Sequence, residues 1–252
     1  MNLYSLKDKT FLITGASSGI GAACCKLLSE LGASIILTGR DSARLSETIQ
    51  KMKIGNHYSF DFDLTNIVDI EDRLVPILAK YKKVDGFIHS AGIDVTLPIS
   101  SLTIKHYLNV FNTNVFSGLE IARILSKKIY IPENGSSFVF IASIMGVVGV
   151  SGKVAYSASK GALISACRSM AIELASKKIR VNCVSPAIVK TKLAEELFST
   201  LPEESVNSIE KSHPLGLGRT SDIASACLYL LSEDSRWITG SNLIIDGGYS
   251  IV

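Results

Sequence analysis

The stretch Thr14-Gly15-Ala16-Ser17-Ser18-Gly19-Ile20-Gly21 lies between a short apolar run and a longer amphipathic segment. The run before it, Thr10–Thr14, has the composition of a buried strand, and Gly19–Leu31 has the apolar periodicity of a helix. Glycines in such a turn allow a sharp change of direction, a close approach of backbone to ligand and tight packing of helix on strand. The N–H groups and positive dipole end of the helix N-terminus favour an anion. The stretch therefore predicts a turn that binds a dinucleotide pyrophosphate.

The alternation of short apolar runs and amphipathic segments continues along the chain. Further strands are expected at Ser34–Thr38, His57–Phe60, Asp85–His89, Ser136–Ala142, Arg180–Val184 and Leu243–Ile245. Helices are expected between them at Arg40–Met52, Ile67–Tyr81, Ile104–Ile129, Ala155–Ser176 and Ser221–Leu231. Strands that are apolar on both faces and alternate with helices indicate a parallel sheet covered on both sides. The predicted fold class is α/β, a doubly wound parallel sheet of the Rossmann type with about seven strands and right-handed crossovers.

No linker rich in Pro, Gly or Ser divides the chain, and its 252 residues suit one α/β unit, so residues 1–252 are expected to form a single domain. The segment Ile188–Pro214 interrupts the regular alternation, because it is rich in Glu, Ser and Lys and only weakly amphipathic. Long irregular segments inside compact domains are usually functional. We expect a substrate lid at 188–214, with a plain surface excursion as the alternative.

Composition argues against several classes of function. The net charge is +3 and the basic residues are scattered, without the clustered stripe of a nucleic-acid-binding protein. Apolar runs are too short for the ~20 residues of a membrane span, and Met1–Lys7 lacks the order of a secretion signal. Five cysteines without metal-ligand spacing and four isolated histidines predict reduced thiols, no metal site and a cytoplasmic location.

A candidate catalytic group follows the fifth predicted strand. Tyr156 and Lys160 stand four residues apart at the start of a predicted helix, so their side chains share one face. Ser143 ends the strand before them, and ligands of open α/β sheets bind beyond the carboxyl ends of the strands. A lysine ammonium is expected to lower the pKa of a tyrosine from ~10 and so ready it for proton transfer. Tyr156 is then a candidate acid/base toward a carbonyl oxygen that Ser143 hydrogen-bonds.

Together these motifs resemble the short-chain dehydrogenase/reductase family, in particular its 3-oxoacyl-acyl-carrier-protein reductase-like members. The resemblance runs from about Leu6 to Gly248. It implies hydride transfer between a nicotinamide cofactor and a carbonyl or secondary alcohol. It also implies that Ser143, Tyr156 and Lys160 are the catalytic trio, that Asn114 joins them through a water-linked proton relay, and that Lys160 binds the nicotinamide ribose.

The resemblance further implies a path for the cofactor. The expected binding residues are Gly15, Ser17, Ser18, Gly19, Ile20, Arg40, Asp63, Leu64, Ala91, Gly92, Tyr156, Lys160, Pro186, Val189 and Thr191. Asp63 resembles the position that hydrogen-bonds the adenine; read alone, it is a helix cap. Two departures stand out: His89-Ser90 replaces Asn-Asn, and Ala187 replaces a glycine. We expect His89 to be a structural histidine that ties its strand to a neighbour.

The end of the second strand bears on the cofactor phosphate. An NAD-preferring site places a carboxylate there, but this chain has Gly39 followed by Arg40. Arginine offers a planar, permanently charged donor fork that suits phosphate, unless Arg40 only covers the surface. Asp41 is expected to cap the following helix. We therefore expect NADP(H) to be preferred over NAD(H).

The substrate stays open at this level. Candidates are a 3-oxoacyl group on acyl carrier protein, a keto-sugar or polyol, and another small alcohol. A catalytically silent dinucleotide-binding regulator would be expected to lack Tyr156 or Lys160, and a sugar epimerase or dehydratase would need more chain after Val189. The resemblance implies a homotetramer, or at least a dimer, with Asp246-Gly247-Gly248 near a subunit contact.

Overall fold

The computed structural model describes residues 5–199 and 201–251. The first residues of the N-terminal segment and Thr200 of the expected lid lie outside the described residues.

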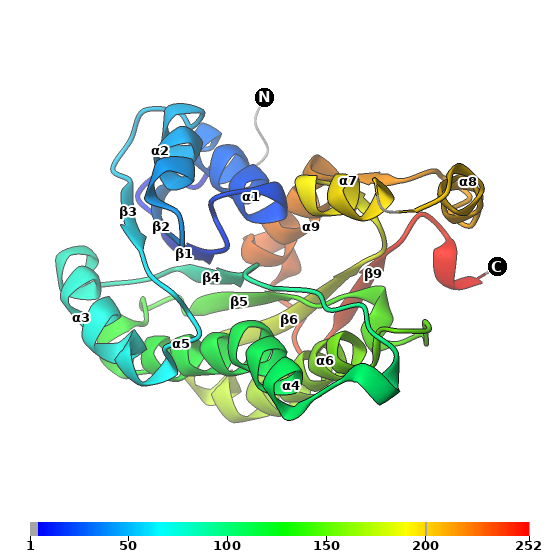
Figure 1. Cartoon of the computed structure of the whole chain (residues 1–252). Coiled ribbons are helices and arrows are strands. Elements are labelled where there is room, and N and C mark those ends of the chain that lie inside the picture. The colour runs from blue at the N-terminus through cyan, green and yellow to red at the C-terminus, as the bar shows by residue number, and fades with distance from the viewer. Residues whose placement is uncertain (1–4, 200, 252) are drawn as a thin grey trace.

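A parallel sheet of seven strands forms the centre of the described chain, in the order β3-β2-β1-β4-β5-β6-β9 (Figure 1). The strands are β1 (Thr10–Thr14), β2 (Ser34–Gly39), β3 (Tyr58–Asp61), β4 (Gly86–His89), β5 (Ser136–Ile141), β6 (Ile179–Pro186) and β9 (Asn242–Ile245). Strand order reverses between β1 and β4, which opens a crevice at their carboxyl ends. The predicted fold class and strand number are confirmed.

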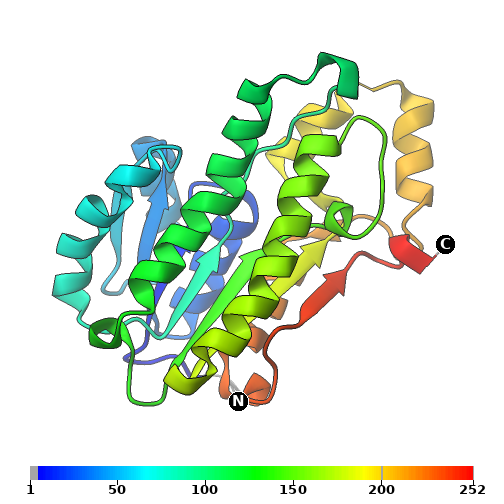
Figure 2. The ribbon, with the colours of Figure 1, turned by 90° about the horizontal axis from the view of Figure 1, so that it is seen from below.

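Helices cover both faces of this sheet. The face above the sheet in Figure 1 carries α1 (Gly19–Glu30), α2 (Ser42–Gln50) and α9 (Thr220–Leu231). The opposite face, seen from below in Figure 2, carries α3 (Ile70–Tyr81), α4 (Ile104–Phe111), α5 (Ser117–Leu125) and α6 (Val154–Leu174). Each face of the sheet has its own hydrophobic core, and successive residues of a strand point into the two cores in turn. In β1, Leu12 packs in the core on the α3–α6 side, whereas Phe11 and Ile13 pack in the core on the α1–α9 side.

Shorter elements complete the described chain. A two-stranded parallel pair joins β7 (Val189–Lys190) to β8 (Gly218–Arg219), with α7 (Lys192–Phe198) and α8 (Glu203–Lys211) between them. The 3₁₀ turns are η1 (Ile67–Asp69), η2 (Ile99–Ser101), η4 (Lys128–Tyr130), η5 (Ile144–Gly146), η6 (Ala175–Lys177), η7 (Glu233–Ser235) and η8 (Tyr249–Ile251).

The single helix expected over Ile104–Ile129 is wrong in detail, because α4 and α5 are separated by a π-helical segment, η3 (Asn112–Phe116). A π segment inserts a wider turn and is frequent at functional sites. Here it brings Asn114 into the interior, where its side chain is fully buried.

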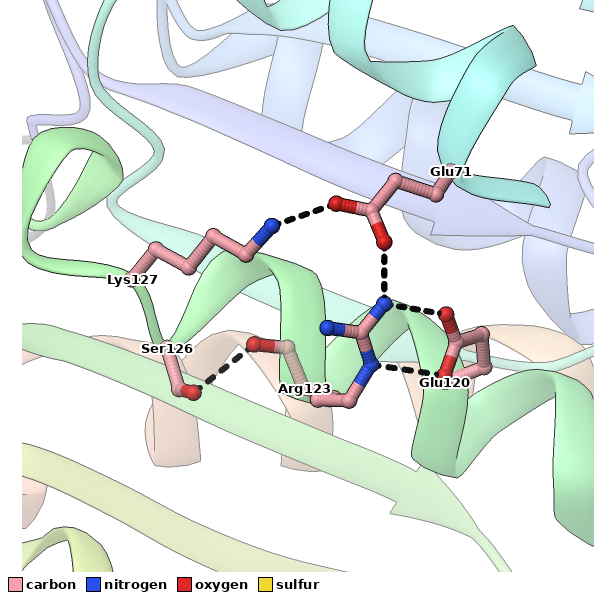
Figure 3. Close-up of polar contacts among 5 residues, drawn as sticks. All are labelled: Glu71, Glu120, Arg123, Ser126 and Lys127. Carbon is pink, nitrogen blue, oxygen red and sulfur yellow. Dashed lines mark hydrogen bonds and ion pairs between the residues drawn. The ribbon is translucent and has the colours of Figure 1, made fainter.

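A surface network of charges links α3 to α5 (Figure 3). Glu71 of α3 pairs with Arg123 and Lys127, and Arg123 also binds Glu120 through its Nε at 2.9 Å. These hydrogen bonds hold the pKa of Glu71 below its usual value. All four side chains remain partly exposed to solvent. Exposed ion pairs contribute little to the free energy of unfolding, so the network adds little to the stability of the fold.

The described chain also bears on membrane, metal and redox roles. No helix of the described chain is long and apolar enough to cross a bilayer. Within residues 5–199 and 201–251, no group of three or more His, Cys, Asp or Glu side chains could hold a metal ion. All five cysteines are buried free thiols.

The interstrand tie expected of His89 is present. Its Nδ1 accepts a hydrogen bond from the Thr14 hydroxyl at 3.0 Å, and its Nε2–H donates to the Asn114 carbonyl at 3.2 Å. The Thr14 oxygen already accepts from the N–H groups of Ser90 and Ala91, which leaves its proton for His89 and fixes the tautomer. Burial, and secondarily the charge of Lys160, lowers the pKa of His89 to about 3. The ring is therefore neutral in the folded state.

This burial predicts a pH-dependent stability. An unfolded histidine takes up a proton near pH 6.5, whereas His89 in the folded state does so only near 3. The unfolded state thus binds more protons between these values, and stability is lost as the pH falls below 6.5. Between pH 7.5 and pH 5, urea unfolding should show a loss of about 2 kcal/mol in the wild type that is missing in His89→Asn. His106→Asn, which keeps His89, should behave as the wild type; parallel curves for wild type and His89→Asn would contradict the assignment.

Candidate functional site

A cavity of about 950 Å³ lies over the carboxyl ends of the central strands. It is bordered by the turns after β1, β2, β4, β5 and β6, where the strand order reverses. Every residue expected to bind the cofactor lines it: Gly15, Ser17, Ser18, Gly19, Ile20, Arg40, Asp63, Leu64, Ala91, Gly92, Tyr156, Lys160, Pro186, Val189 and Thr191. Ser143 also lines the cavity, whereas Asn114 is buried behind its wall.

The glycine turn after β1 has no room for side chains. A Cβ on Gly15 would lie 2.7 Å from the Ala91 nitrogen, and Gly15 adopts a φ of +64°. A Cβ on Gly21 would lie 2.4 Å from the Gly15 oxygen. At the start of α1, Ser18 makes no side-chain cap and the first turn holds no acidic residue. The first N–H groups of the helix therefore face the cavity end without a competing anion, as a phosphate site requires.

Asn114 fastens the loop after β4 to the catalytic helix. Its Oδ1 accepts from the Ile93 N–H at 2.8 Å, and its Nδ2 donates to the Ile93 carbonyl and the Ser159 hydroxyl, both at 3.0 Å. Asn114 and Lys160 both lie beside Gly92. A Cβ added to Gly92 would be 3.3 Å from Lys160 Nζ and 3.4 Å from Asn114 Oδ1. Asn114 thus positions the backbone beside Lys160.

Ser143, Tyr156 and Lys160 converge as their spacing predicts. Lys160 lies inside the cavity wall, where its Nζ donates to the Ile141 carbonyl at 2.8 Å and sits 5.6 Å from the centre of the Tyr156 ring. Ser143, just beyond the end of β5, lines the same cavity, and its hydroxyl acts to lower the pKa of Tyr156. The start of α6 packs closely on η5, where a Cβ on Gly146 would lie 2.9 Å from the backbone nitrogen of Gly161.

The protonation of this group differs from the sequence expectation. Burial raises the pKa of Tyr156 to about 12, against the lowering effect of the Ser143 hydrogen bond, and the charge of Asp94 raises it further. The lowered tyrosine pKa that we expected is therefore not found in this structure, because removal from water outweighs the lowering effect of Ser143. Burial also lowers the pKa of Lys160 to about 8. Near neutral pH the tyrosine is protonated and can act as an acid.

Two arginines lie at the end of the cavity next to β2. Arg40 and Arg44 both line it, and no carboxylate follows β2 before Asp41. Asp41 caps α2, as expected, by accepting a hydrogen bond from the Arg44 N–H at 3.0 Å. Asp63 accepts from the N–H and hydroxyl of Thr65 at 3.0 and 2.9 Å, so its carboxylate is held in a local turn at the cavity edge.

Sequence reasoning missed four charged residues of the cavity wall: Arg44, Asp94, Lys153 and Lys192. Lys153 forms an ion pair with Asp94 and a hydrogen bond with Thr96, and its Nζ lies 6.0 Å from the centre of the Tyr156 ring. The position of Lys153, three residues before Tyr156, was a usable signal. The position of Asp94 was not, because only the folded loop brings it beside Lys153.

The segment expected to be an irregular lid is more regular than its sequence indicates. It holds α7 and α8, and α8 projects beyond the sheet at the right of Figure 1. No described residue of α8 is buried, which explains its polar composition. The helix is favoured instead by Glu203 and Glu204 in its first turn and Lys211 in its last, charges that suit the helix dipole. The segment borders the cavity through Ile188, Val189, Thr191, Lys192, Ala194, Leu201, Ser208, Ile209, Ser212 and His213.

Known proteins share both sequence and fold with this chain. The family profile described as "Enoyl-(Acyl carrier protein) reductase" matches residues 15–250. The NAD-dependent glycerol dehydrogenase of Listeria innocua is 30% identical over 249 residues, covering 98% of this chain and 96% of that protein. The 3-oxoacyl-[acyl-carrier-protein] reductase of Thermotoga maritima is 31% identical over 250 residues, covering 98% and 99%.

A solved structure gives the same result at the level of the fold. The 4-hydroxyisoleucine dehydrogenase complexed with NADH superposes with a TM-score of 0.88 at 32% identity, covering 97% of this chain and 99% of that one. The match therefore extends over nearly the whole chain, and the matched range contains the glycine turn and the positions of Ser143, Tyr156 and Lys160. The chain belongs to the short-chain dehydrogenase/reductase family of oxidoreductases, which act on carbonyl and alcohol groups.

Proposed function

We propose that the protein is an NADP(H)-dependent oxidoreductase that interconverts a carbonyl and a secondary alcohol, with Tyr156 as its acid/base. The observation that carries the proposal is the convergence of Ser143, Tyr156 and Lys160 on one cavity at the switch point of the sheet. A catalytically silent dinucleotide-binding protein has no need for a buried Tyr–Lys pair beside a substrate-sized space.

The cavity fits a dinucleotide on its own geometry. The glycine turn leaves a cradle that a Cβ would fill, and the uncapped start of α1 offers donors to a pyrophosphate. Ser17, Ser18, Gly19 and Ile20 would hold the phosphates, while Pro186, Val189 and Thr191 would hold the opposite end. A nicotinamide bound there supplies or accepts the hydride.

The protein's own groups would manage the proton. In the reducing direction Tyr156, protonated near neutral pH, donates its proton to the carbonyl oxygen, and Ser143 hydrogen-bonds the same oxygen as negative charge develops. The Lys160 ammonium then stabilises the phenolate left behind and can hydrogen-bond the ribose hydroxyls. Asn114, which lies next to Lys160, would position a proton relay toward solvent.

The names of the relatives suggest two classes of substrate. Their names give a 3-oxoacyl group on acyl carrier protein, glycerol and L-xylulose. This chain would accordingly take either an acyl-carrier-bound ketone or a small polyhydroxylated carbonyl compound. We place it in the cytoplasm, in keeping with its five free thiols.

A homotetramer or dimer is also part of the proposal. Trp237 and Ile172 are 91% and 82% exposed, and the edge strand β9 exposes Leu243 and Ile244. Exposed large apolar side chains, and an edge strand without a neighbour on one side, both suit a contact between subunits. Sedimentation velocity measures the state directly, and a monomer at micromolar concentration would refute it.

The assignment of Tyr156 predicts the effect of removing one oxygen atom. Tyr156→Phe should lower kcat by about 10²-fold or more, the usual loss for a general acid, with little change in cofactor affinity because the ring and Lys160 remain. Steady-state kinetics and cofactor titration measure the two effects. Tyr81→Phe, remote from the cavity, should keep wild-type rates; near-full turnover by Tyr156→Phe would mean that another group moves the proton.

The preference for NADP(H) rests on charge at the end of β2. Gly39 offers no carboxylate to the ribose, and two arginines, Arg40 and Arg44, line the same part of the cavity. A 2′-phosphate would meet these two donors, and the nearby carboxylates of Asp41 and Asp63 are engaged in local hydrogen bonds. One relative is named as NAD-dependent, and one similar structure is a complex with NADH. The preference for NADP(H) over NAD(H) is therefore argued from this chain's own residues.

We predict tighter binding of NADPH than of NADH, and a reversed order in Gly39→Asp combined with Arg40→Ala. Loss of a charge-assisted hydrogen bond should raise the Kd for NADPH about tenfold or more. The new Cβ at position 39 would lie 3.1 Å from the Ser17 hydroxyl, which must shift slightly. Fluorescence titration measures both cofactors. Arg73→Ala, at the neighbouring surface cavity, is the control; equal or tighter NADH binding by the wild type would refute the preference.

The segment 188–214 is proposed as a lid. It supplies one side of the cavity through α7 and α8, and α8 has few buried contacts to hold it in place. Such segments open easily and close on ligand. Amide hydrogen exchange in this segment should slow when NADPH and a product alcohol are bound, while exchange in β5 should not change. Equal exchange with and without ligands would make it a plain surface excursion.

A further inference from the structure

A largely buried ion pair in the cavity neither gives nor takes a proton in the transfer described above. Lys153 is 9% exposed, and its ammonium pairs with Asp94 from the loop after β4. Buried ion pairs are poor sources of stability, because desolvation offsets much of the attraction between the charges. Their presence inside a binding cavity therefore points to recognition.

The pair lies next to the reacting position. Lys153 precedes Tyr156 by three residues, at the N-terminal end of α6. Its Nζ is 6.0 Å from the Tyr156 ring centre, nearly as close as Lys160 at 5.6 Å. A substrate whose carbonyl oxygen meets the Tyr156 hydroxyl would thus bring its neighbouring carbon atoms toward Lys153 and Asp94.

The pair keeps hydrogen-bonding capacity for a ligand. An ammonium has three donors, and Lys153 uses two of them on Asp94 and Thr96. Asp94 uses Oδ2 for the ion pair, and its Oδ1 makes no hydrogen bond within the described residues. An enclosed carboxylate oxygen without a donor is costly, and a small shift of the loop would let a ligand satisfy it.

The surroundings of the pair define the kind of ligand. Its net charge is zero, and the wall of the same cavity includes the apolar residues Ile93, Ile144, Val150 and Ile188. A neutral hydroxyl both accepts from an ammonium and donates to a carboxylate. A substrate carboxylate would meet repulsion from Asp94, and a plain acyl chain would offer no partner to Asp94 Oδ1 or to the third donor of Lys153.

We propose that Lys153 and Asp94 recognise a hydroxyl group on the carbon next to the reacting carbonyl, or on the following carbon. The substrate class is then a polyhydroxylated ketone or polyol rather than an acyl thioester. This inference rests on the proposed function and narrows its substrate.

A purely structural role makes a different prediction. The same two loops are also joined by the hydrogen bond from the Leu97 N–H to the Gly152 carbonyl at 3.0 Å. If the ion pair only clamps these loops, its loss would weaken turnover of every substrate in parallel. Recognition of a hydroxyl instead changes the ratio between two substrates that differ only in that group.

The test compares kcat/KM of the full-length enzyme with NADPH for butan-2-one, 3-hydroxybutan-2-one, 4-hydroxybutan-2-one and 3-oxobutanoate. At least one hydroxyketone should exceed butan-2-one by about 100-fold or more, since sites built to bind a hydroxyl reject analogues that lack it. Lys153→Met and Asp94→Asn should each bring this ratio to within about tenfold of unity, while Lys128→Met, an exposed lysine, should preserve it.

Three results would overturn the inference: equal kcat/KM for ketone and hydroxyketones, a preference for 3-oxobutanoate, or variants that keep the wild-type ratio. In each of them the ketones are still reduced, so the proposed function survives. Turnover of none of the four compounds, with NADPH or NADH, would count against the proposed function itself and against the inference that rests on it.

Discussion

The close approach of backbone to backbone at the first strand–helix turn is the constraint on which the site depends. A Cβ at Gly15 or Gly21 would lie within 2.7 and 2.4 Å of other main-chain atoms. Without side chains at these two positions, α1 packs directly on the turn and the turn packs against the loop after β4. The contact between this turn and the loop after β4 forms the floor of the cavity between β1 and β4.

A chain of buried polar groups carries this arrangement to the catalytic helix. Thr14 binds His89, His89 binds the Asn114 carbonyl, and the Asn114 side chain binds Ser159 of α6. Each group in the series is satisfied by the next, so the network specifies one geometry in an otherwise apolar core. The π-helical turn is the local distortion that lets Asn114 take part.

The sequence predicted the sheet well because its strands are buried on both faces, a pattern that local composition records directly. The predicted strand Ser34–Thr38 differs from β2 by one residue. The proximity of Tyr156 and Lys160 was predictable for a similar reason, since helical spacing alone places one beside the other. The residues implied for the cofactor line one cavity, although their contacts with it remain predictions.

What the sequence did not predict depends on contacts between distant residues. The π segment inside the expected helix Ile104–Ile129 arises from packing around Asn114, and periodicity does not record it. The helices of the 188–214 segment bury too little to show an apolar face. Asp94 meets Lys153 only through the fold, and the raised pKa of Tyr156 follows from burial that spacing cannot measure.

The five buried thiols give each layer of the molecule its own native chemical probe. Cys24, Cys25 and Cys227 belong to the core between the sheet and α1–α9, whereas Cys167 and Cys183 belong to the core on the α3–α6 side. A thiol reagent can reach them only when the layer above opens. Their separate alkylation rates, resolved by mass spectrometry of peptides, therefore report which side of the sheet loosens first under heat or denaturant, without any added label.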